Sequence, residues 1–413
     1  MKCFHVMIKP IGPVCNVNCT YCFYLSKERL LETATGWRLP DDLLEKFIRQ
    51  YIEGQEAEEI VFSWQGGEPT LRGLDFFRKV VALEKRYRQP GIRIENDLQT
   101  NGILLDDEWG EFLGKNGFLV GLSIDGPRDL HDTYRVDKKG EGTFDRVLAA
   151  GRLLGKHGVT FNSLTVVNRK NAREPLRVYR FLRDVLKSTR IQFIPCVEPG
   201  NFARVAPGLG ESDSLPLAGS PASRPGSPDS IVTDWSVDPD DFGTFLCRIF
   251  DEWYRKDVGR VFVYLFEAAL GRWMGMPPSI CCQAPVCGHG LALEHDGSVY
   301  SCDHYVYPEY RLGNIREEPL AEMAFSPRQR EFGSAKSRSL PRQCLRCRFL
   351  FVCNGGCPRN RFIRAADDEP GLNYLCRGLY KYFTHIEPYM KKLAAHYGRQ
   401  QKEAAGFAPP FNL

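Results

Sequence analysis

Stretches typical of buried strands alternate with amphipathic helices along the first half of the chain. Runs rich in apolar and β-branched residues predict six strands, at 5–9, 59–64, 92–99, 118–123, 161–167 and 190–197. Helical periodicity predicts the segments between them as helices, at 40–53, 74–88, 106–115, 144–157 and 175–187. Because alternating strands and helices form parallel βα units, we predict an α/β fold built on a parallel sheet.

Six βα units are too few to close an eight-unit barrel, so we expect a partial (β/α)6 barrel of the TIM type, open at one side. In such folds the functional loops follow the carboxyl ends of the strands. After the barrel comes a stretch rich in Pro, Gly and Ser, and then helices predicted at 239–255 and 377–397. We expect five parts: a core barrel (1–198), a flexible excursion (199–236), connecting helices (237–280), a cysteine-rich domain (281–380) and a C-terminal helix and tail (381–413).

Composition narrows the class of protein. The chain has 413 residues, of which 43% are hydrophobic and 26% charged, and its net charge of +4 favours no nucleic-acid partner. The start, MKCFHVMIKP, lacks the apolar core of a signal peptide, and no run approaches the ~18 apolar residues that cross a membrane. We therefore expect a cytoplasmic monomer without a membrane partner. In that compartment fifteen cysteines indicate metal or redox chemistry rather than disulfides.

Three cysteines follow the first predicted strand with the spacing C-x3-C-x2-C: Cys15, Cys19 and Cys22. Three thiolates around a 4Fe–4S cube leave one iron open to a ligand that carries an amine and a carboxylate. This loop, with an aromatic residue after its last cysteine, resembles the signature of the radical SAM enzymes. The resemblance implies a 4Fe–4S cluster that binds S-adenosylmethionine (SAM). A three-cysteine zinc loop is the alternative reading of the loop alone.

Two further segments end predicted strands. Gly66 and Gly67, in Gln-Gly-Gly-Glu-Pro, would let a ligand approach the backbone, and Glu68 would hold a positive amine. The segment resembles the one with which radical SAM enzymes bind the amino group of SAM. The segment 122–127 resembles one shared by radical SAM enzymes that modify peptides, which implies that Ser123 and Arg135 contact the carboxylate or ribose of SAM.

The last third of the chain carries eight cysteines in a spaced order. They are Cys281, Cys287, Cys302, Cys344, Cys347, Cys353, Cys357 and Cys376. Zinc ribbons also use C-x2-C pairs, so zinc is the alternative. The order resembles the SPASM domain, which holds two auxiliary 4Fe–4S clusters. That resemblance implies one cluster on Cys281, Cys287, Cys302 and Cys357, and another on Cys344, Cys347, Cys353 and Cys376. Cys282 competes with Cys281 as the ligand.

Asp303 follows Cys302 directly, so its carboxylate would lie beside a redox centre. With KP…CNVNCTYCFY, FSWQGGEPTL, LQTNG, FLVGLSIDGP, GSVYSCDHYV, RLGNI and CNGGC, the chain resembles the anaerobic sulfatase-maturating enzymes over residues 5–200 and 240–390. The family oxidises a cysteine or serine of a sulfatase to Cα-formylglycine, and the resemblance implies that Asp303 is the catalytic base. Tyr24 and Gln65 are placed where they would hold the substrate residue.

The resemblance also implies partners and cofactors. We expect SAM, three 4Fe–4S clusters, an unfolded or nascent sulfatase carrying C/S-x-P/A-x-R, and an electron donor such as flavodoxin or ferredoxin. Two alternatives stay open from the sequence. One is another SPASM peptide modifier, such as a thioether-forming maturase, and the other is a zinc-bound protein without catalysis on a degenerate barrel.

Overall fold

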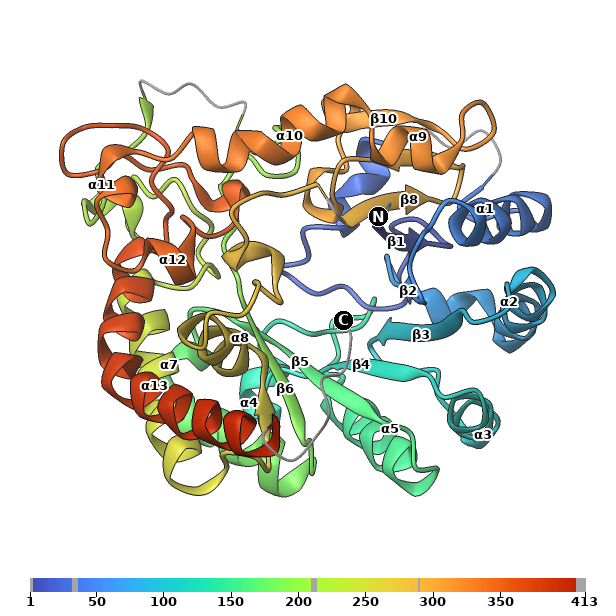
Figure 1. Ribbon diagram of the computed structural model, residues 1–413, viewed down its shortest axis with the longest axis horizontal. Helices are drawn as coiled ribbons and strands as arrows, with labels where there is room; N and C mark the ends of the chain where they lie inside the picture. The colour runs from blue at the N-terminus through green and yellow to red at the C-terminus, as the bar shows by residue number, and fades with distance from the viewer. Residues whose placement is uncertain (1–2, 32–35, 209–213, 289, 406–413) are drawn as a thin grey trace.

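The computed structural model describes residues 3–31, 36–208, 214–288 and 290–405. Its first half contains the six predicted strands as a parallel array: β1 (His5–Lys9), β2 (Glu59–Trp64), β3 (Arg93–Thr100), β4 (Leu119–Ser123), β5 (Phe161–Val167) and β6 (Arg190–Pro195). The sheet does not close, so the predicted α/β fold with a partial barrel is confirmed (Figure 1).

Helices connect these strands and cover their outer face (Figure 1). They are α1 (Asp41–Glu53), α2 (Leu74–Tyr87), α3 (Asp107–Lys115), α4 (Arg128–His131), α5 (Phe144–Lys156) and α6 (Pro175–Arg180). The last predicted helix, 175–187, differs from its prediction, because α6 continues as a π-helical turn, η4 (Phe181–Val185). Helix α1 forms because Leu43, Phe47 and Tyr51 share one face, which is buried against Phe62 and Trp64 of β2.

The sheet continues beyond the six predicted strands. β7 (Phe262–Val263) pairs with β6, and β8 (Gly290–Glu294) pairs in parallel with β1 at the other side. β9 (Ser298–Tyr300) pairs antiparallel with β8, and β10 (Arg311–Asn314) pairs antiparallel with β9. Our sequence analysis missed β8 and β9, although Asp296-Gly297 between two apolar runs is a strong hairpin signal. The cysteine-rich region therefore begins as an extension of the core sheet.

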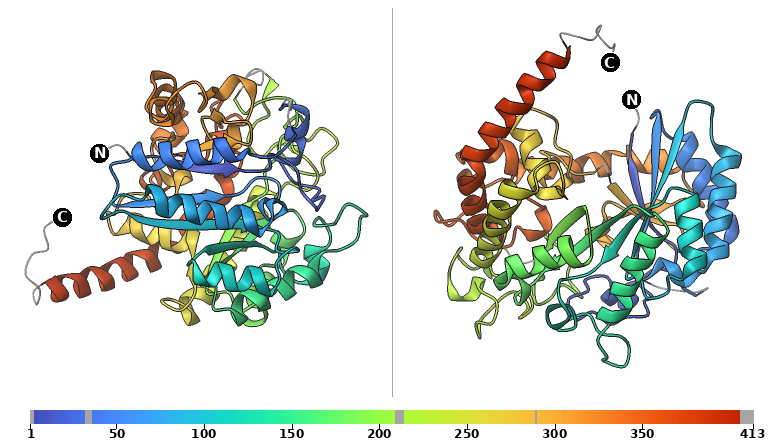
Figure 2. Two further views of the ribbon diagram at one scale, coloured as in Figure 1. Left: turned by 90° about the vertical axis from the view of Figure 1, so that its right-hand side faces the viewer. Right: turned by 90° about the horizontal axis from the view of Figure 1, so that it is seen from below.

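Two long helices close the second half of the molecule. α7 (Pro239–Lys256) begins at Asp238, whose side chain accepts the N–H groups of Asp240 and Asp241. α13 (Cys376–Ala405) packs along α7, with Phe250 against Tyr389, and it projects from the body toward the C-terminus (Figure 2). The other helices of this half are α8 (Tyr264–Trp273), α9 (Leu320–Ala324), α10 (Pro327–Arg338), α11 (Arg342–Leu345) and α12 (Leu350–Cys353).

The described residues of the Pro/Gly/Ser-rich stretch contact the rest of the molecule. Pro199 and Val232 form an isolated bridge, as do Leu217 and Arg364. The hydroxyl of Tyr310 donates a hydrogen bond of 3.1 Å to the carbonyl of Pro207. Part of the predicted excursion, 209–213, lies outside the described residues, and the expected five-part division stays a prediction. Within the described ranges, no helix has the length and apolarity that a membrane span requires.

Candidate active site

The carboxyl ends of the parallel strands place the sequence motifs at one edge of the sheet. Lys9, the last residue of β1, precedes the cysteine loop and is in register with Glu294, the last residue of β8. Gln65 follows β2, and its N–H donates to the carbonyl of Ile8 at 2.9 Å. Strands β3 and β4 lead into Asn101 and Asp125. Loops far apart in sequence therefore meet around the cysteine loop.

The cysteine loop is held by the segment after α4. The N–H of Asn18 donates to the carbonyl of Val136 at 2.7 Å, and that of Thr20 to Tyr134 at 2.9 Å. Burial is the largest cause that raises the pKa of Cys15 to about 12 and of Cys19 to about 11, and the neighbouring thiolates raise both further. Three thiols that interact this way would release their protons to solvent readily only when a positive centre such as iron binds the sulfurs. The loop thus fits the predicted cluster site.

The glycine segment packs tightly on the chain that enters the cysteine loop. The N–H of Gly67 donates to the carbonyl of Gly12 at 2.8 Å, and the N–H of Glu68 to that of Val14 at 2.9 Å. A Cβ atom on Gly67 would lie 1.9 Å from the carbonyl oxygen of Val14. Gly66 has a φ of +129°, which disfavours any side chain. Both glycines therefore permit a backbone contact within the protein, and their predicted contact with SAM stays a prediction.

The carboxylate of Glu68 is fully occupied by the protein. It accepts hydrogen bonds from the N–H and hydroxyl of Thr70 (3.1 and 2.6 Å), the hydroxyl of Thr100 (2.7 Å) and the N–H of Asn101 (2.8 Å). Burial raises its pKa, and these donors act in the opposite direction. Glu68 thereby ties the loop after β2 to the loop after β3, and its expected contact with a positive amine stays a prediction.

Arg135 is likewise engaged by its own chain. Its guanidinium contacts the buried carboxylate of Asp125 at 3.0 and 3.2 Å, and one of its nitrogens lies 3.9 Å from the sulfur of Cys19. Asp125 also accepts the hydroxyl of Tyr21. Arg135, in the segment after α4, therefore links the cysteine loop to Asp125, which follows β4. Ser123 ends β4 in a half-buried position, and contact of either residue with SAM stays a prediction.

Asp303 lies in a buried group of charges that the sequence analysis did not anticipate. Its carboxylate forms an ion pair with Lys9, whose side chain is 2% exposed. The Lys9 ammonium also lies 4.6 Å from the ring centroid of Tyr24, and the Tyr24 hydroxyl donates to Glu294. Burial opposes the charge of Asp303, but Lys9 and neighbouring cations outweigh it and lower its pKa. Asp303 is thus held as a carboxylate. Lys9 belongs to the Lys-Pro pair of the family resemblance, but nothing in the sequence indicated that it would pair with Asp303.

The eight tail cysteines gather in two groups, one around Cys357 and one around Cys344. Burial and the charges of Cys357 and Cys281 raise the pKa of Cys287 and Cys302. Burial, followed by the charges of Cys344 and Cys347, raises the pKa of Cys353 to about 11 and that of Cys376 to about 12.

Cys357 therefore belongs to the group of Cys281, Cys287 and Cys302, although in the sequence it lies between Cys353 and Cys376 of the other group. Cys282 interacts with Cys281 and Cys357 as well, so the first group has five thiols. Among the described residues, no three His, Cys, Asp or Glu side chains converge as the ligands of a single metal ion do. Groups made only of thiols, from which three or four would bind each cluster, fit iron–sulfur cubes, whose irons are spread over a larger volume than one ion.

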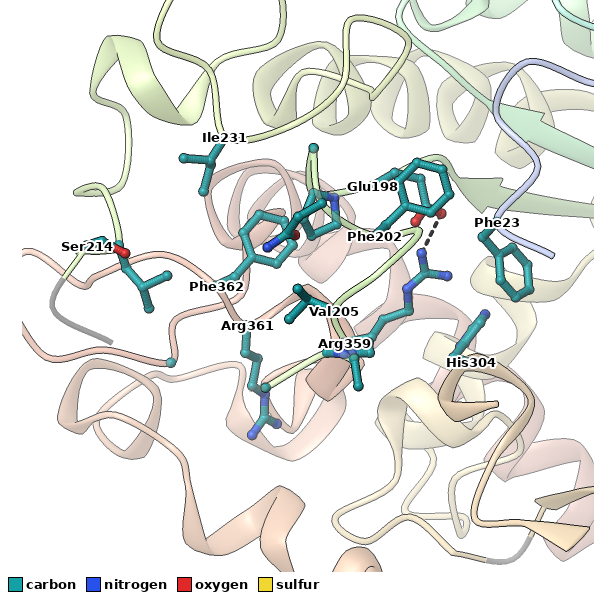
Figure 3. Close-up of a pocket in the computed structure, with 18 of the residues that line it drawn as sticks. Phe23, Glu198, Phe202, Val205, Ser214, Ile231, His304, Arg359, Arg361 and Phe362 are labelled. Carbon is teal, nitrogen blue, oxygen red and sulfur yellow. Dashed lines mark hydrogen bonds and ion pairs between the residues drawn. The ribbon is translucent and has the colours of Figure 1, made fainter. Parts of the chain in front are cut away.

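A cavity of about 690 Å³ lies beside these groups, between the cysteine loop and residues 199–208, which we call the strap (Figure 3). Phe23 and His304 form one end, and Ile231 and Phe362 lie toward the other. Arg359 reaches across to form a buried ion pair with Glu198. The volume of the cavity and its mixture of polar and apolar lining residues are typical of a ligand pocket. Of the described residues that line it, His304 adjoins Asp303, whereas Tyr24 and Gln65 lie outside the lining.

Comparison with known proteins gives a consistent picture. Residues 10–182 match the Radical SAM superfamily and residues 282–348 an iron–sulfur cluster-binding domain named SPASM. The chain is 47% identical to a serine-type anaerobic sulfatase-maturating enzyme of Bacteroides thetaiotaomicron, over 98% of this chain and 94% of that protein. It is 33% identical to a cysteine-type enzyme of Clostridium novyi, over 93% and 95% of the two chains.

Solved structures agree with these sequence matches. Native anSMEcpe with bound AdoMet has a TM-score of 0.80 and 33% identity to this chain, covering 95% of this chain and 99% of that one. A second structure of anSMEcpe, with bound AdoMet and Cp18Cys peptide, has a TM-score of 0.80 and 32% identity, with the same coverage.

Proposed function

The chain belongs to the anaerobic sulfatase-maturating enzymes, and we propose from this premise that it oxidises a serine or cysteine side chain of a sulfatase polypeptide to Cα-formylglycine. The observation that carries the proposal is the environment of Asp303. This carboxylate is mostly buried next to Cys302, is kept charged by Lys9, and adjoins the cavity through His304. A charged carboxylate between a redox site and a cavity is suited to remove a proton while an electron leaves.

The reaction removes two protons and two electrons from the target residue, because CH2OH becomes CHO. When bound, SAM and its cluster supply an organic radical that takes one hydrogen atom from Cβ, and an auxiliary cluster takes the remaining electron. Asp303 takes the proton of the hydroxyl or thiol as general base. A cysteine passes through a thioaldehyde, which water converts to the aldehyde with loss of hydrogen sulfide.

The other site residues hold and shape the two cofactor regions. We propose that Cys15, Cys19 and Cys22 hold the SAM-binding cluster. The saturated carboxylate of Glu68 and the ion-paired guanidinium of Arg135 support positioning roles, in which these two side chains fix the loops around SAM. SAM would contact the backbone at Gly66 and Gly67 and the hydroxyl of Ser123. In the substrate region, Tyr24 acts through Glu294 and Lys9, and Gln65 lies at the end of β2.

We infer further that serine is an accepted target. The relatives at 47% and 37% identity are of the serine type, whereas the cysteine-type relatives are at 33%. An alcohol is far less acidic than a thiol, whose pKa is near 8.5, so a serine depends more on the base. The charged state of Asp303 favours this use.

The direct test is oxidation of two peptides that carry S-x-P-x-R or C-x-P-x-R, by reconstituted protein with SAM and a reductant under anaerobic conditions. Mass spectrometry would show a loss of about 2 Da from the serine peptide and about 18 Da from the cysteine peptide, because formylglycine is the same product in both. A thioether cross-link within the cysteine peptide, or no change in either peptide, would contradict the proposal.

The two alternatives have less support. Streptococcus suis SuiB bound to S-adenosylmethionine, with a TM-score of 0.59 and 16% identity, supports a shared fold alone. A zinc-bound protein without catalysis does not agree with membership of a radical SAM family. A peptide substrate has support from the anSMEcpe structure with bound peptide. A donor of the flavodoxin or ferredoxin class and a monomeric state stay predictions.

A further inference from the structure

One buried cation near the cavity forms no ion pair with a carboxylate in the part of the chain that the structure describes. Lys27 lies in the 3-10 helix η1 (Leu25–Arg29), directly after the cysteine loop, and its side chain is 0% exposed. Within the described residues, its ammonium has no hydrogen-bond partner. It lies instead 3.1 Å from the ring centroid of Tyr307, which comes from the region after Cys302. A buried ammonium without a hydrogen bond is costly, so its position calls for a physical reason.

Neighbouring charges do not supply that reason. The carboxylates of Asp303 and Glu198 are paired with Lys9 and Arg359, and Glu294 accepts the hydroxyl of Tyr24. Burial, and then the positive charge of Arg359, lower the pKa of Lys27 to about 7, although Glu198, Asp303 and Glu294 act in the opposite direction. The aromatic face of Tyr307 is therefore the specific contact that stabilises this charge.

Tyr307 in turn forms part of the cavity wall. Its ring is 5% exposed and lines the cavity, and its hydroxyl donates a hydrogen bond of 2.6 Å to the carbonyl of Phe202 in the strap. The ring is thus held on its face by Lys27 and at its hydroxyl by the strap. Phe202 lines the same cavity (Figure 3). Three segments far apart in sequence meet in this contact: the helix after the cysteine loop, the cysteine-rich region and the strap.

We propose that Lys27 is a positioning residue that fixes Tyr307, and through it the strap, in the shape that binds the substrate polypeptide. This inference rests on the proposed function, because it takes the cavity as the site of that polypeptide. Lys27 does not touch the substrate in this proposal. It acts by holding one wall, so its loss should weaken peptide binding more than turnover of bound peptide.

If Lys27 only filled space, the expected result would be the opposite. Lys27→Met would then keep the length of the side chain, remove a costly buried charge, and leave peptide binding unchanged. If it positions Tyr307, Lys27→Met should raise the Kd of a fluorescent S-x-P-x-R peptide about tenfold. The peptide KM should rise to a similar extent, while kcat falls much less. Lys85→Met, an exposed lysine of α2, is the matched control and should leave Kd and KM at the parent values.

The Tyr307 variants make the test specific. Tyr307→Leu should raise the Kd of the peptide as Lys27→Met does. The two substitutions remove the same contact, so the Kd of the double variant should not exceed the larger Kd of the two single variants. Tyr307→Phe keeps the ring against Lys27 and loses the hydrogen bond to Phe202, so it should weaken binding by a smaller factor. If Lys27→Met does not retain its iron, the two Tyr307 variants decide the question.

Kd is measured anaerobically by fluorescence anisotropy on protein that contains its clusters, without SAM or reductant. A parent-like Kd for Lys27→Met, or additive effects in the double variant, would overturn the proposal while the proposed function stands. A parent protein that neither binds nor oxidises the peptide would instead overturn the proposed function.

Discussion

Buried charges gather at both ends of the barrel strands, and the two groups differ in how their charges are paired. At the amino end, Glu252 of α7 accepts hydrogen bonds from Arg180 (2.7 Å) and Arg183 (3.0 Å). Asp257 accepts the hydroxyl of Tyr179 and a second bond from Arg183, both at 2.8 Å. Each buried acid there has two strong donors, so the group joins α6 and α7 and leaves no charge for a ligand.

At the carboxyl end, the charges that lie beside the cavity are paired one to one, and the pairing is incomplete. Lys9 pairs with Asp303 and Arg359 with Glu198, whereas Lys27, among the residues that the structure describes, contacts the ring of Tyr307 without an ion pair. This group lies beside a cavity and beside the cysteine groups. The difference teaches that a buried charge does not by itself indicate a functional site. A buried charge that is incompletely paired and lies next to a cavity does.

The largest effect that would separate the two ends is loss of the cysteine loop. Replacing Cys15, Cys19 and Cys22 by alanine should abolish SAM cleavage and lower the iron content from about twelve to about eight atoms per chain, because three four-iron cubes become two. Iron and sulfide analysis after anaerobic reconstitution measures this. A parent content near four would contradict two auxiliary clusters in the tail.

The second effect concerns the base. Asp303→Asn keeps the shape of the side chain but does not accept a proton readily, so the yield of formylglycine should fall about 10²–10⁴-fold. The iron content and reductive SAM cleavage should persist, and the ratio of SAM cleaved to product formed should rise. A serine peptide should lose more than a cysteine peptide, because its hydroxyl is less acidic. Formation of formylglycine at the parent rate would refute the assignment of Asp303.

The third effect is expected at the amino end and should touch stability instead of chemistry. Glu252→Gln removes the charge that Arg180 and Arg183 share, which should lower the free energy of unfolding by ~3 kcal/mol. The lower end of the usual range applies because the Arg180 side chain is 52% exposed. Chemical denaturation of the protein with its clusters, followed by circular dichroism, measures the loss. The peptide kcat/KM should remain at the parent value, and a large drop would break the comparison.

The smallest effect comes from Asp97 of β3, a carboxylate with neither a cation nor a proposed function. Burial raises its pKa to about 6, although the hydroxyl of Ser63 donates to it. In the folded protein it holds a proton between its ordinary pKa, near 4, and about 6, whereas the unfolded chain does not. The free energy of unfolding therefore falls as pH rises through this window and stays lower above it.

Asp97→Asn should remove this pH dependence and stabilise the protein by ~1–2 kcal/mol at pH 7, because one pKa unit corresponds to ~1.4 kcal/mol and partial exposure reduces the effect. Denaturation of both proteins at pH 4.5 and pH 7 provides the comparison. If the free energy of unfolding changed equally with pH in the two proteins, the raised pKa of Asp97 would be contradicted.

Much of the fold and the cofactor chemistry follows from local patterns. Strands β1 to β6 were predictable because each is a short apolar run between helical periods, and parallel βα units tolerate few other arrangements. The loop of Cys15, Cys19 and Cys22 is equally local, since its three ligands lie within eight residues. The Asp-Gly turn before Ser298 offered a similar local signal for β8 and β9, so that omission was avoidable.

Tertiary structure decided what depends on contacts between distant segments. Sequence periodicity does not state which strand lies beside β1, so it did not place Glu294 of β8 next to Lys9. The sequence analysis predicted no internal partners for Glu68 and Arg135, but in the structure both form hydrogen bonds or ion pairs within the protein. A buried charge is costly without such partners, and these come from distant parts of the chain.

The sequence by itself determined the α/β class, the cysteine spacings and the family resemblance, because these depend on residues that are near one another in the chain. Only the tertiary structure decided that Lys9 keeps Asp303 charged and that Lys27 rests on Tyr307 beside the strap. Such pairs join segments about 280 to 300 residues apart, and their geometry is set by the packing of β8 and the cysteine-rich region against the barrel.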